Sequence, residues 1–104
     1  MIHVTVLYPH AADVRFDHDY YRDRHLPMVA EKLGPALKRY AIDRGIAGGA
    51  PGAPPPFVAA VRLYFDSVEA FQGSFGPKAS EILADIPNYT NAQPMVVVNE
   101  VVKD

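Results

Sequence analysis

The sequence contains no cysteine. This absence excludes disulfide bonds, thiolate nucleophiles, zinc ribbons and iron–sulfur ligation. Small extracellular domains usually depend on such crosslinks, so we expect the protein to be cytoplasmic. The chain also lacks any apolar run close to the roughly 18 residues that identify a membrane-spanning helix. Residues 1–7 alternate apolar and polar side chains rather than forming a signal peptide, and we expect no membrane partner.

An excess of one charge is absent as well. Lys and Arg total 10, Asp and Glu total 12, and the formal net charge is −2. A nucleic-acid-binding protein needs a basic surface to neutralise phosphates, so no nucleic-acid partner is expected. What the chain does have is apolar side chains, which make up 49% of its 104 residues. These values predict one globular domain over residues 1–104, and so short a chain favours burying part of its apolar surface against another molecule.

Alternation of side chains between two faces predicts strands over residues 2–8, 38–44 and 57–65, and we interpret residues 95–102 as a final strand. Asp17 is expected to cap a helix between the first two strands, and Asp66 or Ser67 a helix between the last two. Pro27 and Pro77 should interrupt these helices, because proline has no amide to donate. The order β-α-β-β-α-β predicts an α+β, ferredoxin-like fold with both helices on one face of a four-stranded antiparallel sheet.

The other face of this predicted sheet mixes apolar and charged side chains. It would carry His3, Thr5, Leu7, Asp43, Val58, Arg62 and Tyr64, together with either Val96, Val98 and Glu100 or Met95, Val97 and Asn99. Such a surface is too apolar to stay in water, so we expect a homodimer that packs sheet against sheet and leaves an enclosed pocket.

His25 is the strongest candidate for chemistry. Tyr21, His25, Val29 and Leu33 recur at a spacing of four, which directs one helix face inward and allows Tyr21 to meet His25. A histidine with a pKa near 6.5 exchanges protons at neutral pH, and apolar neighbours would keep it neutral, as a base requires. The alternative is a core histidine bonded to a backbone carbonyl that Pro27 leaves free.

A second polar segment, residues 85–90, ends the second helix with an amide, a phenol and a hydroxyl. Asn88 and Tyr89 could orient a small polar ligand there. The alternative is a helix-terminating turn satisfied by Asn88 and Thr90.

The sequence shows no metal or cofactor motif. His18 and His25 lie two helical turns apart, too far to share one ion, and the His-Glu-x-x-His pattern is absent. The glycine-rich segment 45–52 lacks both the lysine ending of a P-loop and the spacing of a dinucleotide turn, so we interpret it as a cover or dimer-contact loop. We therefore expect no metal and no resident cofactor.

Several of these motifs together resemble the EthD family. Tyr20-Tyr21 followed by His25, Pro27 and Val29 resembles the signature Y-Y-x-x-x-H-x-P-L-V, with Met28 in place of the commoner leucine. Residues 75–77, 81–82 and 85–90 resemble its second signature, with Lys78 where many relatives have histidine. The resemblance implies a dimeric α/β-barrel related in fold to muconolactone isomerases and cofactor-free monooxygenases. It also implies a link to bacterial ether degradation beside a cytochrome P450 system.

Two functions are compatible with these observations. In the first, the protein is an enzyme acting on a small apolar metabolite that is cyclic, aromatic or ether-derived, by isomerase, dehydratase or oxidoreductase chemistry. His25 and Tyr21 would be catalytic, and the substrate would contact Tyr8, Arg62, Tyr64, Asn88 and Tyr89. A redox reaction would need a borrowed cofactor or partner. In the second, the protein is a carrier that shelters the product of a partner monooxygenase.

Overall fold

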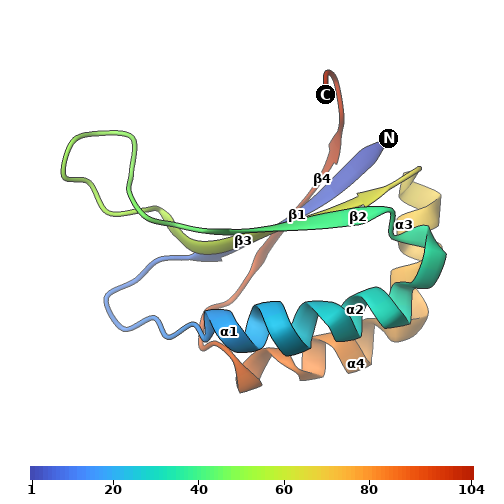
Figure 1. Ribbon diagram of the computed structural model, residues 1–104, viewed down its shortest axis with the longest axis horizontal. Helices are drawn as coiled ribbons and strands as arrows, with labels where there is room; N and C mark the ends of the chain where they lie inside the picture. Colours follow the sequence, from blue (N-terminus) through green and yellow to red (C-terminus); the bar gives the residue numbers. More distant parts are fainter.

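Four strands form one antiparallel sheet, and the helices lie on one of its faces in the computed structural model, which describes residues 1–104 (Figure 1). The strand order is β2-β3-β1-β4. This arrangement confirms the predicted α+β, ferredoxin-like fold with proline-interrupted helices. In chain order the elements are β1 (Ile2–Pro9), α1 (His18–Tyr20), a π-helical turn (Tyr21–His25), α2 (Leu26–Leu33), a 3₁₀ turn (Gly34–Ala36), β2 (Arg39–Arg44), β3 (Phe57–Phe65), α3 (Val68–Phe75), a 3₁₀ turn (Gly76–Lys78), α4 (Ala79–Ala84), a 3₁₀ turn (Ile86–Asn88) and β4 (Met95–Glu100).

The core lies between the sheet and the helices. In β1, Val4 pairs with Leu63 of β3 on one side and with Val98 of β4 on the other. Successive strand side chains alternate between faces, so Val61 and Leu63 point toward the helices while Arg62, between them, points away. Each large apolar side chain buried here stabilises the fold by about 1.5–3 kcal/mol relative to leaving it exposed.

The first helical run, residues 18–33, changes its hydrogen-bond pattern just before Pro27. Asp17 caps the run as predicted, because its carboxylate accepts from the Tyr20 amide at 3.0 Å. Pro27 supplies no amide, and the turn before it, Tyr21–His25, is π-helical. Such wider turns are often found at functional sites, and this one carries two of the predicted site residues.

The second helical run, residues 68–88, begins at Ser67, whose hydroxyl accepts from the Ala70 amide at 3.1 Å. Gly76 and Pro77 convert it to a 3₁₀ turn, and α4 then continues to Ala84. A further 3₁₀ turn follows directly. This sequence of short helices brings the 85–90 segment under the sheet beside the first helical run. None of the helices has the length and apolar character that a membrane span requires.

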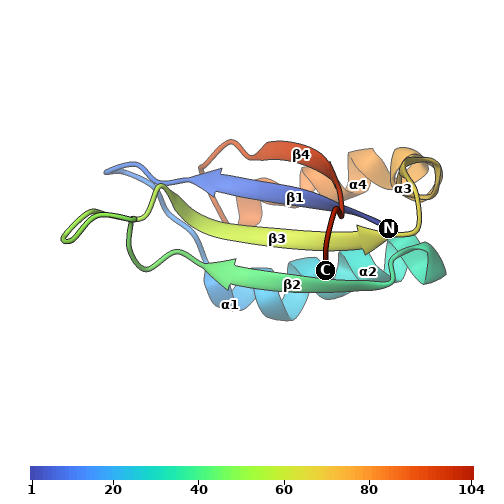
Figure 2. The same cartoon turned by 90° about the horizontal axis from the view of Figure 1, so that it is seen from above.

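The opposite face of the sheet is covered by no other element of the chain, and Figure 2 looks down on it. Val96 lies on the helix side with its β1 partner Val6, so Met95, Val97 and Asn99 belong to this open face. Of the two alternatives for the last strand, the structure therefore selects the second. Polar groups lie among the apolar ones, since the Asn99 amide donates to Thr5 Oγ1 at 3.1 Å and the Arg39 guanidinium lies 3.7 Å from the Tyr64 ring centroid.

Candidate active site

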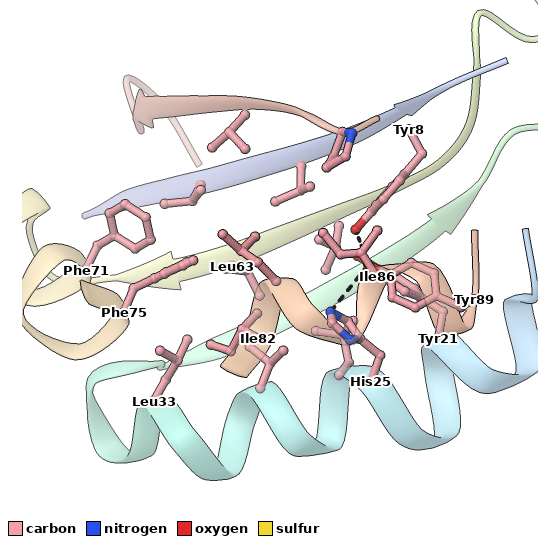
Figure 3. Close-up of a pocket in the computed structure, with 18 residues that line it drawn as sticks. Tyr8, Tyr21, His25, Leu33, Leu63, Phe71, Phe75, Ile82, Ile86 and Tyr89 are labelled. Atoms are coloured by element: carbon pink, nitrogen blue, oxygen red, sulfur yellow. Dashed lines mark hydrogen bonds between the residues drawn. The ribbon is translucent and has the colours of Figure 1, made fainter. Parts of the chain in front are cut away.

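A cavity of about 280 Å³ lies between the helical layer and the sheet (Figure 3). Apolar side chains from β1, β3 and both helical runs form almost all of its lining. The polar groups on its wall are the hydroxyls of Tyr8, Tyr21 and Tyr89 and the imidazole of His25. No cluster of three or more metal-ligating side chains occurs anywhere in the chain.

Three of these polar groups, Tyr8, Tyr89 and His25, form a connected row that continues to Asp85. The hydroxyls of Tyr8 and Tyr89 lie 2.6 Å apart, and the Tyr89 hydroxyl lies 3.5 Å from Nε2 of His25. On the far side of the ring, Nδ1 of His25 lies 2.8 Å from Oδ2 of Asp85. The row thus joins β1, the end of the second helical run and the π turn of the first.

Asp85 is held in place by two further hydrogen bonds. The Tyr20 hydroxyl donates to Oδ1 at 2.7 Å, and the Asn88 amide donates to the same oxygen at 2.9 Å. Burial opposes ionisation of Asp85, but hydrogen bonds from Asn88, His25 and Tyr20 together outweigh it and hold the pKa of this carboxyl below its usual range. Asp85 is therefore an anion at neutral pH.

His25 is neutral at the same pH. Its side chain is deeply buried, the residue being only 4% exposed, and this desolvation lowers the pKa of the imidazole, with the hydrogen bond and charge of Asp85 acting in the opposite direction. An anionic carboxylate only accepts hydrogen bonds. Nδ1 must therefore carry the proton of the neutral ring and donate a hydrogen bond to Asp85. The lone pair of Nε2 is then left facing Tyr89 and the cavity.

The tyrosines of the cavity are hydrogen-bond donors, in contrast to the basic Nε2 of His25. Burial raises the pKa values of Tyr8, Tyr21 and Tyr89 above the ordinary value, so their hydroxyls stay protonated and can act as hydrogen-bond donors. Tyr21 also supports the histidine sterically, because its ring stacks on the imidazole at 5.3 Å between centroids and 15° between planes. The site thus combines one base with several donors.

The structure brings together four of the predicted site residues and separates the others. Tyr8, Tyr21, His25 and Tyr89 line the cavity. Asn88 does not line it and touches the site through Asp85.

Arg62 and Tyr64 lie on the open face of the sheet, where Arg62 pairs with Asp43 at 3.3 Å. Side-chain alternation along β3 explains this placement, because Val61 and Leu63 occupy the cavity side. Any substrate contact by Arg62 or Tyr64 would have to come from that open face.

Asp85 was not among the predicted site residues. The sequence placed it only at the start of the 85–90 segment, and its partner is 60 residues away in the chain. The available signal was its position four residues before Tyr89, in a segment of the second signature. His25 bonds this carboxylate rather than a main-chain carbonyl, the partner that the alternative interpretation gave it.

Comparison with known proteins assigns the chain to a family. The sequence model of the EthD domain matches residues 10–93. The chain belongs to the EthD family. An EthD-like protein from Ralstonia eutropha has 47% sequence identity and a TM-score of 0.95, with 99% of this chain and 93% of that one covered.

Two solved structures of lower identity share the fold of this EthD-family protein. An EthD-family protein from Bacillus halodurans has 17% identity and a TM-score of 0.66, with coverage of 96% of this chain and 97% of that one. A dimeric ferredoxin-like protein from Thermobifida fusca has 22% identity and a TM-score of 0.53, with coverage of 93% and 87%. No curated protein matches the sequence significantly.

The two signatures that suggested the EthD family meet in space. The first contributes Tyr20, Tyr21 and His25, and the second contributes Asp85, Asn88 and Tyr89. Tyr21, Asp85 and Tyr89 make direct contact with the imidazole of His25. Tyr20 and Asn88 donate hydrogen bonds to Asp85 instead. The residues that carry the resemblance are therefore the residues that build this site.

Proposed function

We propose that this EthD-family protein is an enzyme that moves a proton within a small, mostly apolar metabolite, with His25 as the acid and base. One observation carries the proposal: the row of polar contacts Asp85–His25–Tyr89–Tyr8 ends on the wall of a largely apolar cavity. Ion pairs with a purely structural role also shift the pKa values of histidines. In this protein, however, Nε2 of His25 faces a cavity large enough to hold a ligand.

The proposed step begins with a substrate carbon that is bonded to a carbonyl group. Nε2 of His25 takes a proton from this carbon, and the C–H electron pair forms a carbon–carbon double bond while the carbonyl oxygen becomes an oxyanion. The hydroxyl of Tyr89 or Tyr8 donates a hydrogen bond to that oxyanion. Asp85 stabilises the imidazolium that forms.

The proton then returns by one of two routes. When a second double bond is conjugated with the enolate, delivery to its γ-carbon re-forms the carbonyl and gives an isomer with a shifted double bond. Delivery to a β-hydroxyl group breaks the C–O bond, expels water, re-forms the carbonyl and gives the dehydrated product. Neither route changes the oxidation state of the substrate overall, so neither requires an oxidant or a reductant. Tyr21 positions the imidazole by stacking on it.

A direct test follows exchange of the α-protons of 2-tetralone in D₂O by NMR. The wild type should accelerate exchange over buffer, and His25→Ala should lose about 10²–10⁴-fold of that acceleration, the usual contribution of a general base. His10→Gln, a change at an exposed histidine, is the matched control and should leave the rate unchanged. If folded His25→Ala binds the ketone and exchanges it at the wild-type rate, the protein is a carrier instead.

We also propose that a second copy of the chain covers the open face of the sheet. The face is unpartnered and carries the half-exposed apolar side chains of Met95 and Val97. A fold relative, the Thermobifida fusca protein, is described as dimeric. Light scattering should give twice the 11.4 kDa mass of the chain, and a monomer at micromolar concentration would refute the homodimer.

We propose in addition that a partner monooxygenase supplies the oxygenated compound on which the protein acts. We also propose that the protein is cytoplasmic. The first rests on the family resemblance, and the second on the absence of cysteine from the sequence. An oxidation at this site would need such a partner to accept the electrons, and a reduction would need it to supply them.

A further inference from the structure

The cavity is polar at one end and apolar at the other. Figure 3 shows Tyr8, His25 and Tyr89 together at one end, with Phe71 and Phe75 at the opposite end. Phe71 and Phe75 lie edge to face, with 5.4 Å between ring centroids and 89° between planes. A ligand oxygen therefore has hydrogen-bond partners only at the tyrosine end, whereas the other end offers a ring face and a ring edge to an apolar group.

No charged side chain compensates for a charged ligand inside the cavity. The wall contains no Lys, Arg, Asp or Glu. His25 is the only titratable group on the wall that could become a cation, and its Nδ1 is already paired with the anionic Asp85. A carboxylate bound at Nε2 would lose its hydration without gaining a free counter-charge, which is costly in an apolar environment.

The volume limits the size of the ligand. An apolar cavity of about 150 Å³ holds one benzene ring, so the 280 Å³ of this cavity corresponds to about two rings. The solvent-exposed part of the wall adds no charge requirement, because its two half-exposed residues, Leu83 at 52% and Val96 at 59% exposure, are both apolar.

We infer that the ligands of this cavity are uncharged molecules of about two rings that carry one hydroxyl or carbonyl at a terminal position. The oxygen binds between Tyr8 and Tyr89, within reach of His25, and the rings extend toward Phe71 and Phe75. This inference rests on the site of the proposed function, but it concerns binding and does not require turnover. It excludes carboxylates, phosphates and amines as substrates.

The test compares three probes of equal ring size by isothermal titration calorimetry at pH 7.5. 2-Naphthol carries a neutral hydroxyl, 2-naphthoate carries a negative charge, and naphthalene carries no oxygen. We expect 2-naphthol to bind at least about tenfold more tightly than 2-naphthoate, and about three- to tenfold more tightly than naphthalene. Equal or tighter binding of 2-naphthoate would overturn the inference.

Two variants test the orientation. Tyr89→Phe should abolish the preference for 2-naphthol over naphthalene, and Phe75→Ala should favour the three-ring 2-anthrol over 2-naphthol. Tyr64→Phe, which removes a hydroxyl from the open face, is the matched control and should change neither ratio. If Tyr89→Phe keeps the preference, or if Tyr64→Phe loses it, the proposed orientation is wrong.

The binding and exchange assays separate the two proposals. Selective 2-naphthol binding without 2-tetralone exchange supports the ligand class and refutes the enzyme. Exchange that depends on His25 in a protein that binds 2-naphthoate as well as 2-naphthol supports the enzyme and refutes the ligand class.

Discussion

Nδ1 of His25 lies 2.8 Å from a carboxylate oxygen of Asp85, a residue 60 positions later in the chain. This contact fixes which ring nitrogen carries the proton and turns the other toward Tyr89. It also holds the π turn of the first helical run against the end of the second under the sheet. One hydrogen bond thus connects the packing of the fold with the proposed chemistry.

Replacing Asp85 by Asn removes the charge that stabilises the imidazolium. The pKa of His25 should fall further, because the Asp85 charge raises it in the wild type. Proton exchange should slow by about ten- to a hundredfold, which is the change in rate that corresponds to the free energy of a hydrogen bond to a charged group. NMR titration of the His25 ring and the exchange assay check both effects. Asn88→Ala keeps the carboxylate and should have a much smaller effect, and an unchanged His25 titration in Asp85→Asn would contradict the pairing.

The lowered pKa of His25 predicts the direction of the pH dependence. The unfolded chain binds a proton at His25 below about pH 6.5, whereas the folded chain binds it only at lower pH. The contribution of neutral, buried His25 to the free energy of unfolding is therefore fully present above about pH 6.5. It is lost as the pH falls through the pKa of His25 in the folded chain. Exchange activity should decline over the same acid range.

Urea denaturation of the wild type and His25→Gln between about pH 5 and 8 measures this contribution. The wild type should lose more stability than the variant as the pH falls, because the variant lacks the titrating group. Parallel curves for the two proteins would show that His25 does not titrate differently in the folded and unfolded states.

The hydrogen bond between Tyr8 and Tyr89 is short and buried, with 2.6 Å between the oxygens. Tyr8→Phe leaves the Tyr89 hydroxyl with only its long contact to His25, so the free energy of unfolding should fall by about 1–3 kcal/mol. Tyr64→Phe removes a hydroxyl that makes only a 3.5 Å contact with Arg62 and should cost much less. Equal losses in the two variants by urea denaturation would argue against a special role for the buried pair.

Pro27 is expected to maintain the π turn before it. Pro27→Ala restores a backbone amide and lets an ordinary α-helical hydrogen bond form to Asp23, which favours a regular helix. The stacking of Tyr21 on His25 should then change, and exchange activity should fall although stability stays the same or rises. Urea denaturation and the chemical shifts of the His25 ring measure the two effects. Pro35→Ala, beyond the site, is the control.

The two faces of β4 provide a matched pair for the interface. Val97 and Val98 are similarly exposed, at 42% and 44%, but only Val97 lies on the open face. Val97→Asp should convert the proposed dimer to a monomer, because it places an unpaired charge in the interface. Val98→Asp should leave the mass unchanged in light scattering. Dissociation by both variants, or by neither, would argue against packing through the open face.

The local features of the fold could be predicted because nearby residues determine them. Asp17 and the alternation of residues 57–65 act over a few positions, and the spacing of four places His25 inward. The orientation of β4 was ambiguous because residues 95–98 are all apolar, so alternation distinguishes no face. The Asp85–His25 contact depends on how the two helical runs pack, which no short pattern encodes.

The apolar run of β4 also has a consequence for folding in a crowded cell. β4 is an edge strand, and its backbone N–H and C=O groups are unpaired along one side. Edge strands are commonly protected from aggregation by lysine, proline or an inward charge, yet Met95–Val98 contains none of these. A newly made chain is therefore exposed to mispairing at this edge until another surface covers it. Slow association with that surface would allow aggregates to form through these four residues.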